Sequence, residues 1–181
     1  KEKGQIIGQY LNTPGKDQIL HIHQVTEYDP ETLLIGSNDG LTSFKISPAT
    51  GNRIDQHFLE PHLSNRFVYP IYKDREGGLW IGTYYGGINY ASPNRNYFSG
   101  YTHIKYENSI SGNVVSCFAE DQWGNMWIGT EDGGLNELNV KTGIFHAYTQ
   151  QGGDNSLSFD NVHALLNDRD CLWIGTYSGG L

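Results

Sequence analysis

The residue types best suited to binding a ligand lie in four short turns whose sequences vary while the residues around them repeat. These turns are Asn38-Asp39, Tyr84-Tyr85, Glu131-Asp132 and Tyr177-Ser178. Tyrosine rings stack on the faces of pyranose sugars, and carboxylates and amides hydrogen-bond to sugar hydroxyls. Variable residues on a repeated frame are typical of a binding surface, with ordinary solvated turns as the alternative. We therefore predict ligand contacts at Tyr84, Tyr85, Glu131, Asp132 and Tyr177.

A second group of polar residues opens the strand that is expected to begin each repeat. Arg66, Asn113 and His163 are further candidate ligand contacts, and Asn161 occupies a similar position. The segments between repeats add His62, Asn108 and Asn155. Because Asn and Ser often hydrogen-bond to their own backbone in turns, the Asn-Ser pairs could serve a purely structural role instead.

The sequence offers little for catalysis or metal binding. Neighbouring turn residues such as Glu131-Asp132 usually point apart, whereas a glycosidase needs two carboxyl groups about 5–10 Å apart across its sugar. His21-Ile22-His23 would place two imidazoles on one face of a strand, but no third ligand follows at a zinc spacing. The oxygen-rich segment Asp154–Asp160 lacks the pattern of a calcium loop. We expect no catalytic residue, no metal and no cofactor.

A segment that the chain repeats four times must position these candidates. The copies are Leu33–Ser37, Leu79–Thr83, Met126–Thr130 and Leu172–Thr176, and their glycines lie 46, 47 and 46 residues apart. A period in the forties, with strand-like content in every copy, is typical of β-propeller blades. We therefore predict an all-β, β-propeller fragment with about four four-stranded blades of 46–47 residues.

The third repeat predicts the layout of one blade. Its strands are expected at 113–119, 126–130, 135–140 and 144–150, joined by short turns. The second strand is almost wholly apolar, which fits burial on both faces between stacked blades. Its tryptophan recurs in three copies, so we predict core packing for Trp80, Trp127 and Trp173. Trp123, in a turn, is expected at the surface.

The repeat also predicts where the blades begin and end. Residues 1–12 resemble the outer strand of a preceding blade, and three blades are expected at 13–60, 61–106 and 107–150. Residues 151–181 then supply two strands and the start of a third. A ring closed by this chain alone would lack one third strand. We therefore expect a part of a larger ring, of about seven blades, rather than a four-bladed one.

Composition excludes several function classes. The net charge of −8 disfavours a general affinity for nucleic acid or for an anionic membrane surface. No run of 18 apolar residues is present, so no membrane span is expected. Cys117 and Cys171 fall at different places in the repeat, and we expect both to be free.

Several motifs that recur in one order resemble the two-component regulator propeller repeat. The string Leu-Trp-Ile-Gly-Thr-x-x-Gly-Gly-[Ile/Leu] lies at 79–88, at 126–135 (with Met126) and at 172–181. An Asp-x-x-Gly turn precedes it at Asp74 and Asp121, and an Asn-Ser-[Ile/Leu]-Ser linker occurs at 108–111 and 155–158. The first repeat departs most, since Leu34 replaces the tryptophan.

The resemblance implies a sensor ectodomain of a hybrid two-component regulator, of the kind found in gut Bacteroidetes. Such ectodomains are periplasmic, and their propellers precede an immunoglobulin-like domain, a membrane helix and a histidine kinase. Many of them are implied to detect oligosaccharides. The implied partners are an oligosaccharide and the remaining blades of the same protein or of another copy, as in a homodimer. This segment is expected to perform no chemistry, to bind no nucleic acid and to make no membrane contact.

Two other functions fit the same repeat. The blades could form a structural or dimerisation scaffold with no ligand of their own, because exposed strand edges favour association. Alternatively, the segment could belong to a propeller lyase or hydrolase, whose active residues would converge at the mouth of the central channel.

Overall fold

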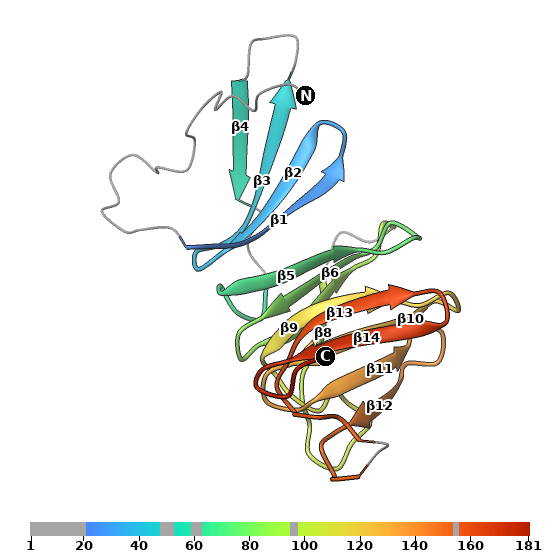
Figure 1. The fold of residues 1–181 in the computed structure, drawn as a ribbon. Coiled ribbons are helices and arrows are strands. Elements are labelled where there is room, and N and C mark those ends of the chain that lie inside the picture. The colour runs from blue at the N-terminus through green and yellow to red at the C-terminus, as the bar shows by residue number, and fades with distance from the viewer. Residues whose placement is uncertain (1–20, 48–52, 59–62, 95–97, 154–155) are drawn as a thin grey trace, which may run out of the picture.

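The computed structural model describes residues 21–47, 53–58, 63–94, 98–153 and 156–181, and all of its regular structure is β (Figure 1). The first sheet contains β1 (Ile22–Asp29), β2 (Thr32–Ser37), β3 (Gly40–Ser47) and β4 (Arg53–Phe58). The second contains β5 (Val68–Lys73), β6 (Leu79–Thr83), β7 (Gly87–Ala91) and β8 (Phe98–Tyr101). The third contains β9 (Val115–Glu120), β10 (Asn125–Thr130), β11 (Leu135–Asn139) and β12 (Ile144–Tyr148). A fourth, two-stranded sheet pairs β13 (Val162–Asp168) with β14 (Cys171–Thr176).

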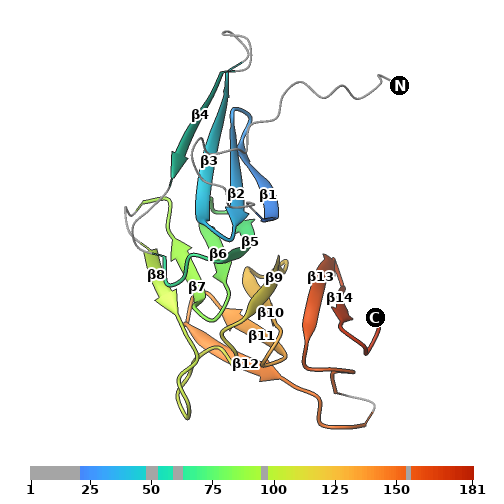
Figure 2. The ribbon, with the colours of Figure 1, turned by 90° about the vertical axis from the view of Figure 1, so that its left-hand side faces the viewer.

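Each sheet is an antiparallel meander whose strands follow one another in chain order. The first strands of neighbouring sheets lie side by side, because β1 contacts β5, β5 contacts β9, and β9 contacts β13. Figures 1 and 2 show the sheets stacked face to face, with β4, β8 and β12 on the outside. This arrangement is that of propeller blades, and the predicted fold class is confirmed. Residues 1–12 lie outside the described residues, and the blade boundaries within the connecting segments stay predictions.

The hydrophobic core lies between the sheets. Its larger part joins the second and third sheets and includes Trp80, Ile88, Phe118 and Ile128. A smaller part joins the first and second sheets around Leu41 and neighbouring aliphatic residues. Because each sheet buries its faces against its neighbours, the fold depends on stacking as well as on strand pairing.

The motif glycine of each second strand lets the next sheet approach closely. A Cβ atom added to Gly36, Gly82 or Gly129 would lie 2.6–2.8 Å from a Cγ1 atom of the valine that opens the next first strand. The three valines are Val68, Val115 and Val162. The glycine therefore recurs because two backbones meet at this point.

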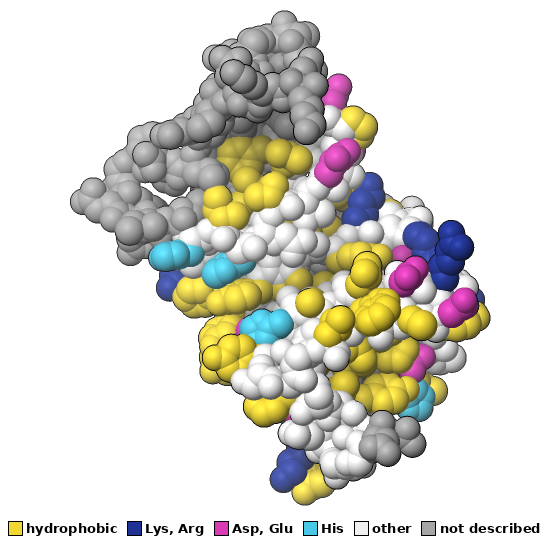
Figure 3. Space-filling view, viewed as in Figure 1, with side chains coloured by type: hydrophobic (Ala, Val, Ile, Leu, Met, Phe, Trp, Pro, Cys, Tyr) yellow, Lys and Arg dark blue, Asp and Glu magenta, His cyan; other side chains and the backbone are white. Residues whose placement is uncertain are grey.

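The recurring tryptophans differ in burial although they share one position. Trp80 is fully buried and Trp127 is partly buried, whereas Trp173 is 48% exposed. The core prediction is thus confirmed for Trp80 and differs for Trp173, because no further sheet covers β13 and β14 among the described residues. Figure 3 shows hydrophobic side chains gathered over these two strands. Trp123 is 69% exposed, as predicted.

An aspartate in the turn between first and second strands holds the tryptophan of the second strand. Asp74 accepts a hydrogen bond from the backbone N–H of Gly78 (2.6 Å) and another from the indole N–H of Trp80 (2.8 Å). Asp121 accepts the equivalent bond from the indole of Trp127 (3.1 Å). The Asp-x-x-Gly motif is therefore a turn that fixes a core side chain.

Candidate functional site

The meander topology places one set of turns and the starts of the first strands at the same end of every sheet. We call this end the channel mouth; it comprises the turns after β2, β6, β10 and β14 and the starts of β1, β5, β9 and β13. The first residue of each turn donates its backbone N–H to the segment that leads into the first strand. The bonds, of 2.9–3.1 Å, join Asn38 to His21, Tyr84 to Phe67, Glu131 to Val114 and Tyr177 to Asn161.

A hydroxyl group further fixes each of these turns. Thr83, Thr130 and Thr176 donate to the carbonyl oxygen four residues later, at distances of 2.8–3.1 Å, and Ser37 donates to Gly40 (3.2 Å). The repeated frame therefore holds the variable turn residues in equivalent positions in the last three blades, whereas the turn of the first blade is one residue shorter.

Every first strand also carries an irregularity close to its start. The register shifts between Ile22 and Gln24, between Val68 and Ile71, between Val115 and Cys117, and between Val162 and Ala164. A residue at such a bulge is displaced from the ladder, and its side chain is redirected. The residues that follow the first residue of each shift are His23, Tyr69, Ser116 and His163, which we call the bulge residues.

The bulge residues of the first two blades contribute to a continuous aromatic cluster. The His23 ring stacks on Tyr69, with centroids 4.0 Å apart, and Tyr69 stacks on Tyr84 at 5.4 Å. Tyr84 meets the edge of Tyr85 at 4.4 Å. Tyr85 is 67% exposed and has a positive φ of 63°. The aromatic cluster, defined as His23, Tyr69, Tyr84 and Tyr85, therefore offers aromatic surface across the boundary between two blades.

The cluster is also polar. The hydroxyl of Tyr85 bonds to that of Tyr84 and is the main cause that raises the pKa of Tyr84, with the Glu131 carboxylate adding to the rise. Burial, assisted by His21, lowers the pKa of His23 below its ordinary value. His23 is therefore held toward its neutral form, in which the ring both donates and accepts a hydrogen bond.

A similar pair lies at the mouth of the fourth blade. The rings of His163 and Tyr177 are 5.8 Å apart, and Tyr177 is 64% exposed. Asn161 lies two residues before His163, and its side-chain oxygen is buried without a hydrogen-bond partner among the described residues. The bulge residue and the turn residue of a blade thus meet in two blades, as Tyr69 with Tyr84 and as His163 with Tyr177.

Other predicted contacts use their polar atoms within the frame. The Asp132 carboxylate accepts the backbone N–H groups of Asn113 (3.2 Å) and Val114 (3.1 Å). The Asn113 side-chain oxygen accepts the backbone N–H of His103 at 2.7 Å. Arg66 is exposed, with its guanidinium 5.0 Å from the centroid of the Phe67 ring. The side chains of Asp132 and Asn113 therefore hold the backbone around the channel mouth in place.

The linker residue Asn108 also uses its side chain within the frame. Asn108 donates to the carbonyl oxygen of Gly143 (2.8 Å) and accepts the N–H of Phe145 (2.8 Å), so it satisfies the edge of β12 rather than its own turn. His62 and Asn155 lie outside the described residues. Within the described ranges, no group of three or more His, Cys, Asp or Glu side chains could hold a metal ion.

Sequence reasoning missed His23 and Tyr69 as members of the aromatic cluster. His23 was considered only beside His21 as a metal motif, and Tyr69 lies in an apolar strand. The signal that finds them is their spacing from the motif glycine of the same blade, which is 13 residues for His23, Tyr69 and Ser116 and 12 residues for His163.

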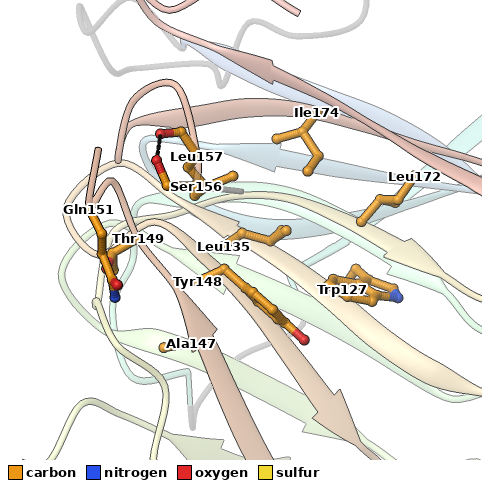
Figure 4. A pocket seen from close by; sticks show the side chains of 10 residues that line it. All are labelled: Trp127, Leu135, Ala147, Tyr148, Thr149, Gln151, Ser156, Leu157, Leu172 and Ile174. Atoms are coloured by element: carbon orange, nitrogen blue, oxygen red, sulfur yellow. Dashed lines mark hydrogen bonds between the residues drawn. The ribbon is translucent and has the colours of Figure 1, made fainter. Parts of the chain in front are cut away.

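A large cavity between the third and fourth sheets has a different origin (Figure 4). It encloses about 480 Å³ and is lined by residues that include Trp127, Tyr148, Leu157 and Leu172. At the equivalent boundary between the second and third sheets, Leu138 of β11 and Phe145 of β12 contribute to the core. The cavity is therefore the space that third and fourth strands fill in the complete sheets, and we do not assign it to a ligand.

Three segments of the chain match the model of the two component regulator propeller. They are residues 62–85, 109–132 and 156–178, and each runs from a linker through the first two strands of a blade into its mouth turn. The chain carries two component regulator propeller repeats. The family inferred from the motifs is thereby confirmed, and the divergent first repeat lies outside the matched segments.

Solved structures share the fold of these regulator propeller repeats. One extracellular domain of a hybrid two component system from B. thetaiotaomicron superposes with a TM-score of 0.73 at 20% identity, covering 88% of this chain and 22% of that one. A second such domain from the same organism gives 0.73 at 22% identity, with coverages of 91% and 23%. An inactive virginiamycin B lyase from Staphylococcus aureus, solved with quinupristin, gives 0.56 at 15% identity, with coverages of 92% and 52%.

The chain therefore spans about a fifth of the length of the two extracellular domains that it resembles. A search of curated protein sequences found no match. Among the described residues, no helix has the length and apolar character needed to cross a bilayer.

Proposed function

We propose that this chain is the ligand-sensing propeller segment of a periplasmic sensor domain, in a hybrid two-component regulator that signals to a histidine kinase. The ligand is an oligosaccharide, and the channel mouth binds it. The observation that carries this proposal is the aromatic cluster of His23, Tyr69, Tyr84 and Tyr85. The matched repeats and the fold shared with extracellular domains of hybrid two component systems support it.

The chemistry of the mouth suits a sugar. Exposed aromatic surface at Tyr85 and Tyr177 offers stacking faces, and the adjacent hydroxyls, imidazoles and the Glu131 carboxylate can bond to sugar hydroxyls. The turns are fixed by backbone and hydroxyl bonds, so little ordering is needed when a ligand binds. The candidate contacts, in order of their support, are Tyr84, Tyr85, Tyr177, His163, Glu131 and Arg66, with Asp132 and Asn113 holding the frame.

Signalling requires that the ligand bind one arrangement of the ectodomain better than another, since equal affinity shifts nothing. The aromatic cluster crosses the boundary between the first and second blades, so a ligand there contacts two sheets at once. The same chain presents the exposed face of β13 and β14, which supports packing against further blades of the same protein or of a second copy. We propose no chemical step for this segment.

A thermal-shift screen of purified oligosaccharides against the complete ectodomain tests the proposal. A ligand at 100 times its Kd stabilises the folded state by about 2.7 kcal/mol, which gives a clear upward shift. We expect one glycan class to produce a saturable shift and the Tyr84→Ala, Tyr85→Ala double variant to weaken its binding about tenfold or more.

Tyr106→Ala is the matched control, because Tyr106 is 92% exposed in a linker remote in sequence from the mouth turns. Its binding should equal that of the unmodified protein. The absence of any shift from a well-folded ectodomain would favour the scaffold function instead.

A further inference from the structure

A second pocket lies at the end of the sheets opposite the channel mouth. It encloses about 450 Å³ between the turns that follow β5, β9 and β11. We call it the turn-end pocket, and its lining includes Arg75, Glu76, Glu120, Trp123 and Lys141. Its volume is within the range of about 300–1,000 Å³ that is usual for small-molecule sites. In Figure 3 most of the Asp and Glu side chains visible in this view, and several Lys and Arg side chains, lie on the right.

Trp123 gives this pocket an exposed aromatic wall. The indole is 69% exposed, although the backbone beneath it is fixed by a hydrogen bond of 2.9 Å from the Trp123 N–H to Asp121. The equivalent residue of the second blade is Glu76, so the aromatic side chain is not required by the turn. Its neighbour Trp127, by contrast, bonds through its indole N–H to the same aspartate. The backbone of Trp123 is therefore held in place, and its indole ring is open to a ligand.

Arg75 gives the pocket a fixed polar wall that crosses between two blades. Its Nε atom lies 2.9 Å from Glu120 Oε1, and its backbone N–H donates to Glu120 Oε2 at 3.0 Å. A terminal guanidinium N–H also donates to the carbonyl oxygen of Asp121. The Arg75 side chain nevertheless remains 57% exposed. Because guanidinium has five N–H groups, it can hold this position and still donate to a ligand.

The charges of the pocket bear on which ligand class fits. The lining carries cations at Arg75 and Lys141 and carboxylates at Asp74, Glu76 and Glu120, so groups of both signs are present. Hydroxyl groups can donate to the carboxylates and accept from the cations. A pyranose ring combines such hydroxyls with an apolar face that stacks on indole.

We propose that the turn-end pocket is a second carbohydrate site, which binds a neutral sugar ring against Trp123. Arg75 and Lys141 donate hydrogen bonds to its hydroxyls, and Glu76 accepts from them. This site is separate from the channel mouth, and it can exist whether or not the mouth binds an oligosaccharide.

Saturation-transfer difference NMR with maltose, cellobiose and lactose, applied to the complete protein that carries this chain, tests the site. We expect at least one disaccharide to bind saturably and Trp123→Ala to raise its Kd about tenfold or more. Because the Trp123 side chain is exposed, this variant should keep the thermal midpoint of the unmodified protein. Arg75→Lys should weaken binding as well, since a single ammonium cannot keep the Glu120 contact and also reach the ligand.

Two control variants establish that the disaccharide binds at this pocket. Tyr106→Ala removes another exposed aromatic ring and should leave the Kd unchanged. The comparison is repeated in the Tyr84→Ala, Tyr85→Ala background, which removes aromatic contacts of the mouth at the other end of the sheets, and Trp123→Ala should raise the Kd there as well. The proposal is overturned if none of the disaccharides binds, if Trp123→Ala binds as well as the unmodified protein, or if only the mouth variant loses binding.

Discussion

Asp121 joins the turn between β9 and β10 to the tryptophan that follows it. Its carboxylate accepts the backbone N–H groups of Trp123 and Asn125, both at 2.9 Å, and the indole N–H of Trp127 at 3.1 Å. The residue is only 4% exposed. Removing it would leave several donors without a partner in a partly buried region.

We therefore expect Asp121→Ala to lower the free energy of unfolding by about 2–4 kcal/mol. Asp168 occupies the equivalent position in the fourth sheet but is exposed, so Asp168→Ala should cost much less. Urea unfolding of both variants checks this difference. Equal losses would show that the turn bonds contribute little.

The two cysteines should differ sharply in reactivity. Burial raises the pKa of the Cys117 thiol to about 11, so its reactive thiolate is scarce near neutral pH, whereas Cys171 is exposed. Titration of the native protein with a thiol reagent at pH 8 should modify Cys171 alone. Cys171→Ser should abolish the native reaction, and guanidinium should then expose Cys117. Rapid modification of the native Cys171→Ser variant would contradict the partly buried position of Cys117.

For single residues, the repeat shows which side chains vary at the turns, but it does not show which atoms those side chains contact. Tyr84, Tyr85 and Tyr177 were identified because they interrupt a repeat, and the structure brings Tyr84 and Tyr177 against bulge residues. Asp132 and Asn113 have the same polar character, yet their atoms bond to the backbone. The residue types alone do not show whether such a side chain faces the mouth or bonds to the backbone, because its partner atoms come from segments about ten to twenty residues away.

The second strand of each blade packs through its glycine against the next sheet. A Cβ at Gly82 would lie 2.5 Å from a Pro70 ring carbon and 2.6 Å from Val115, whereas at Gly175 the nearest atom is the Ala164 Cβ at 3.2 Å. The Pro70 contact lies within the second sheet, whereas Val115 belongs to the next sheet, and Gly175 lacks such a contact because no sheet follows β14 among the described residues.

We therefore expect Gly82→Ala to destabilise the protein by about 1–3 kcal/mol, and Gly175→Ala to cost less. Thermal and urea unfolding of both variants provides the measurement. A Gly175→Ala variant as unstable as Gly82→Ala would mean that strand propensity, rather than contact between sheets, accounts for the glycine.

The repeat was sufficient to predict these elements to within about two residues. Strands expected at 126–130 and 135–140 are found as Asn125–Thr130 and Leu135–Asn139. The register shift in each first strand was not predicted, because a bulge depends on how two strands pair and not on their composition. His23 and Tyr69 were missed for that reason.

For the whole molecule, the exposed apolar face of β13 and β14 is the feature that most affects its association state. Leu166, Trp173 and Leu181 are 63%, 48% and 83% exposed, although the equivalent of Trp173 in the second blade is fully buried. Exposed apolar faces of this kind favour association.

Residues 1–181 expressed alone should therefore self-associate or aggregate. Leu166→Glu should increase the monomer fraction, because it places a charge on the apolar face, whereas Tyr106→Glu should not. Size-exclusion chromatography with light scattering distinguishes these outcomes. A monomer that unfolds cooperatively without any such change would contradict the prediction.

The bulge at the start of every first strand lets one side chain at the channel mouth vary while the residues that pack the sheets together stay the same. Its residue can be histidine, tyrosine or serine while the β-branched aliphatic residue before it, the motif glycine and the turn hydroxyl stay in place. Under the proposed function, duplicating or exchanging a blade therefore adds or replaces its bulge residue and its turn residues, which are the proposed ligand contacts, without redesigning the core. Such a ring can acquire new ligand preferences by recombination of whole blades as well as by point mutation.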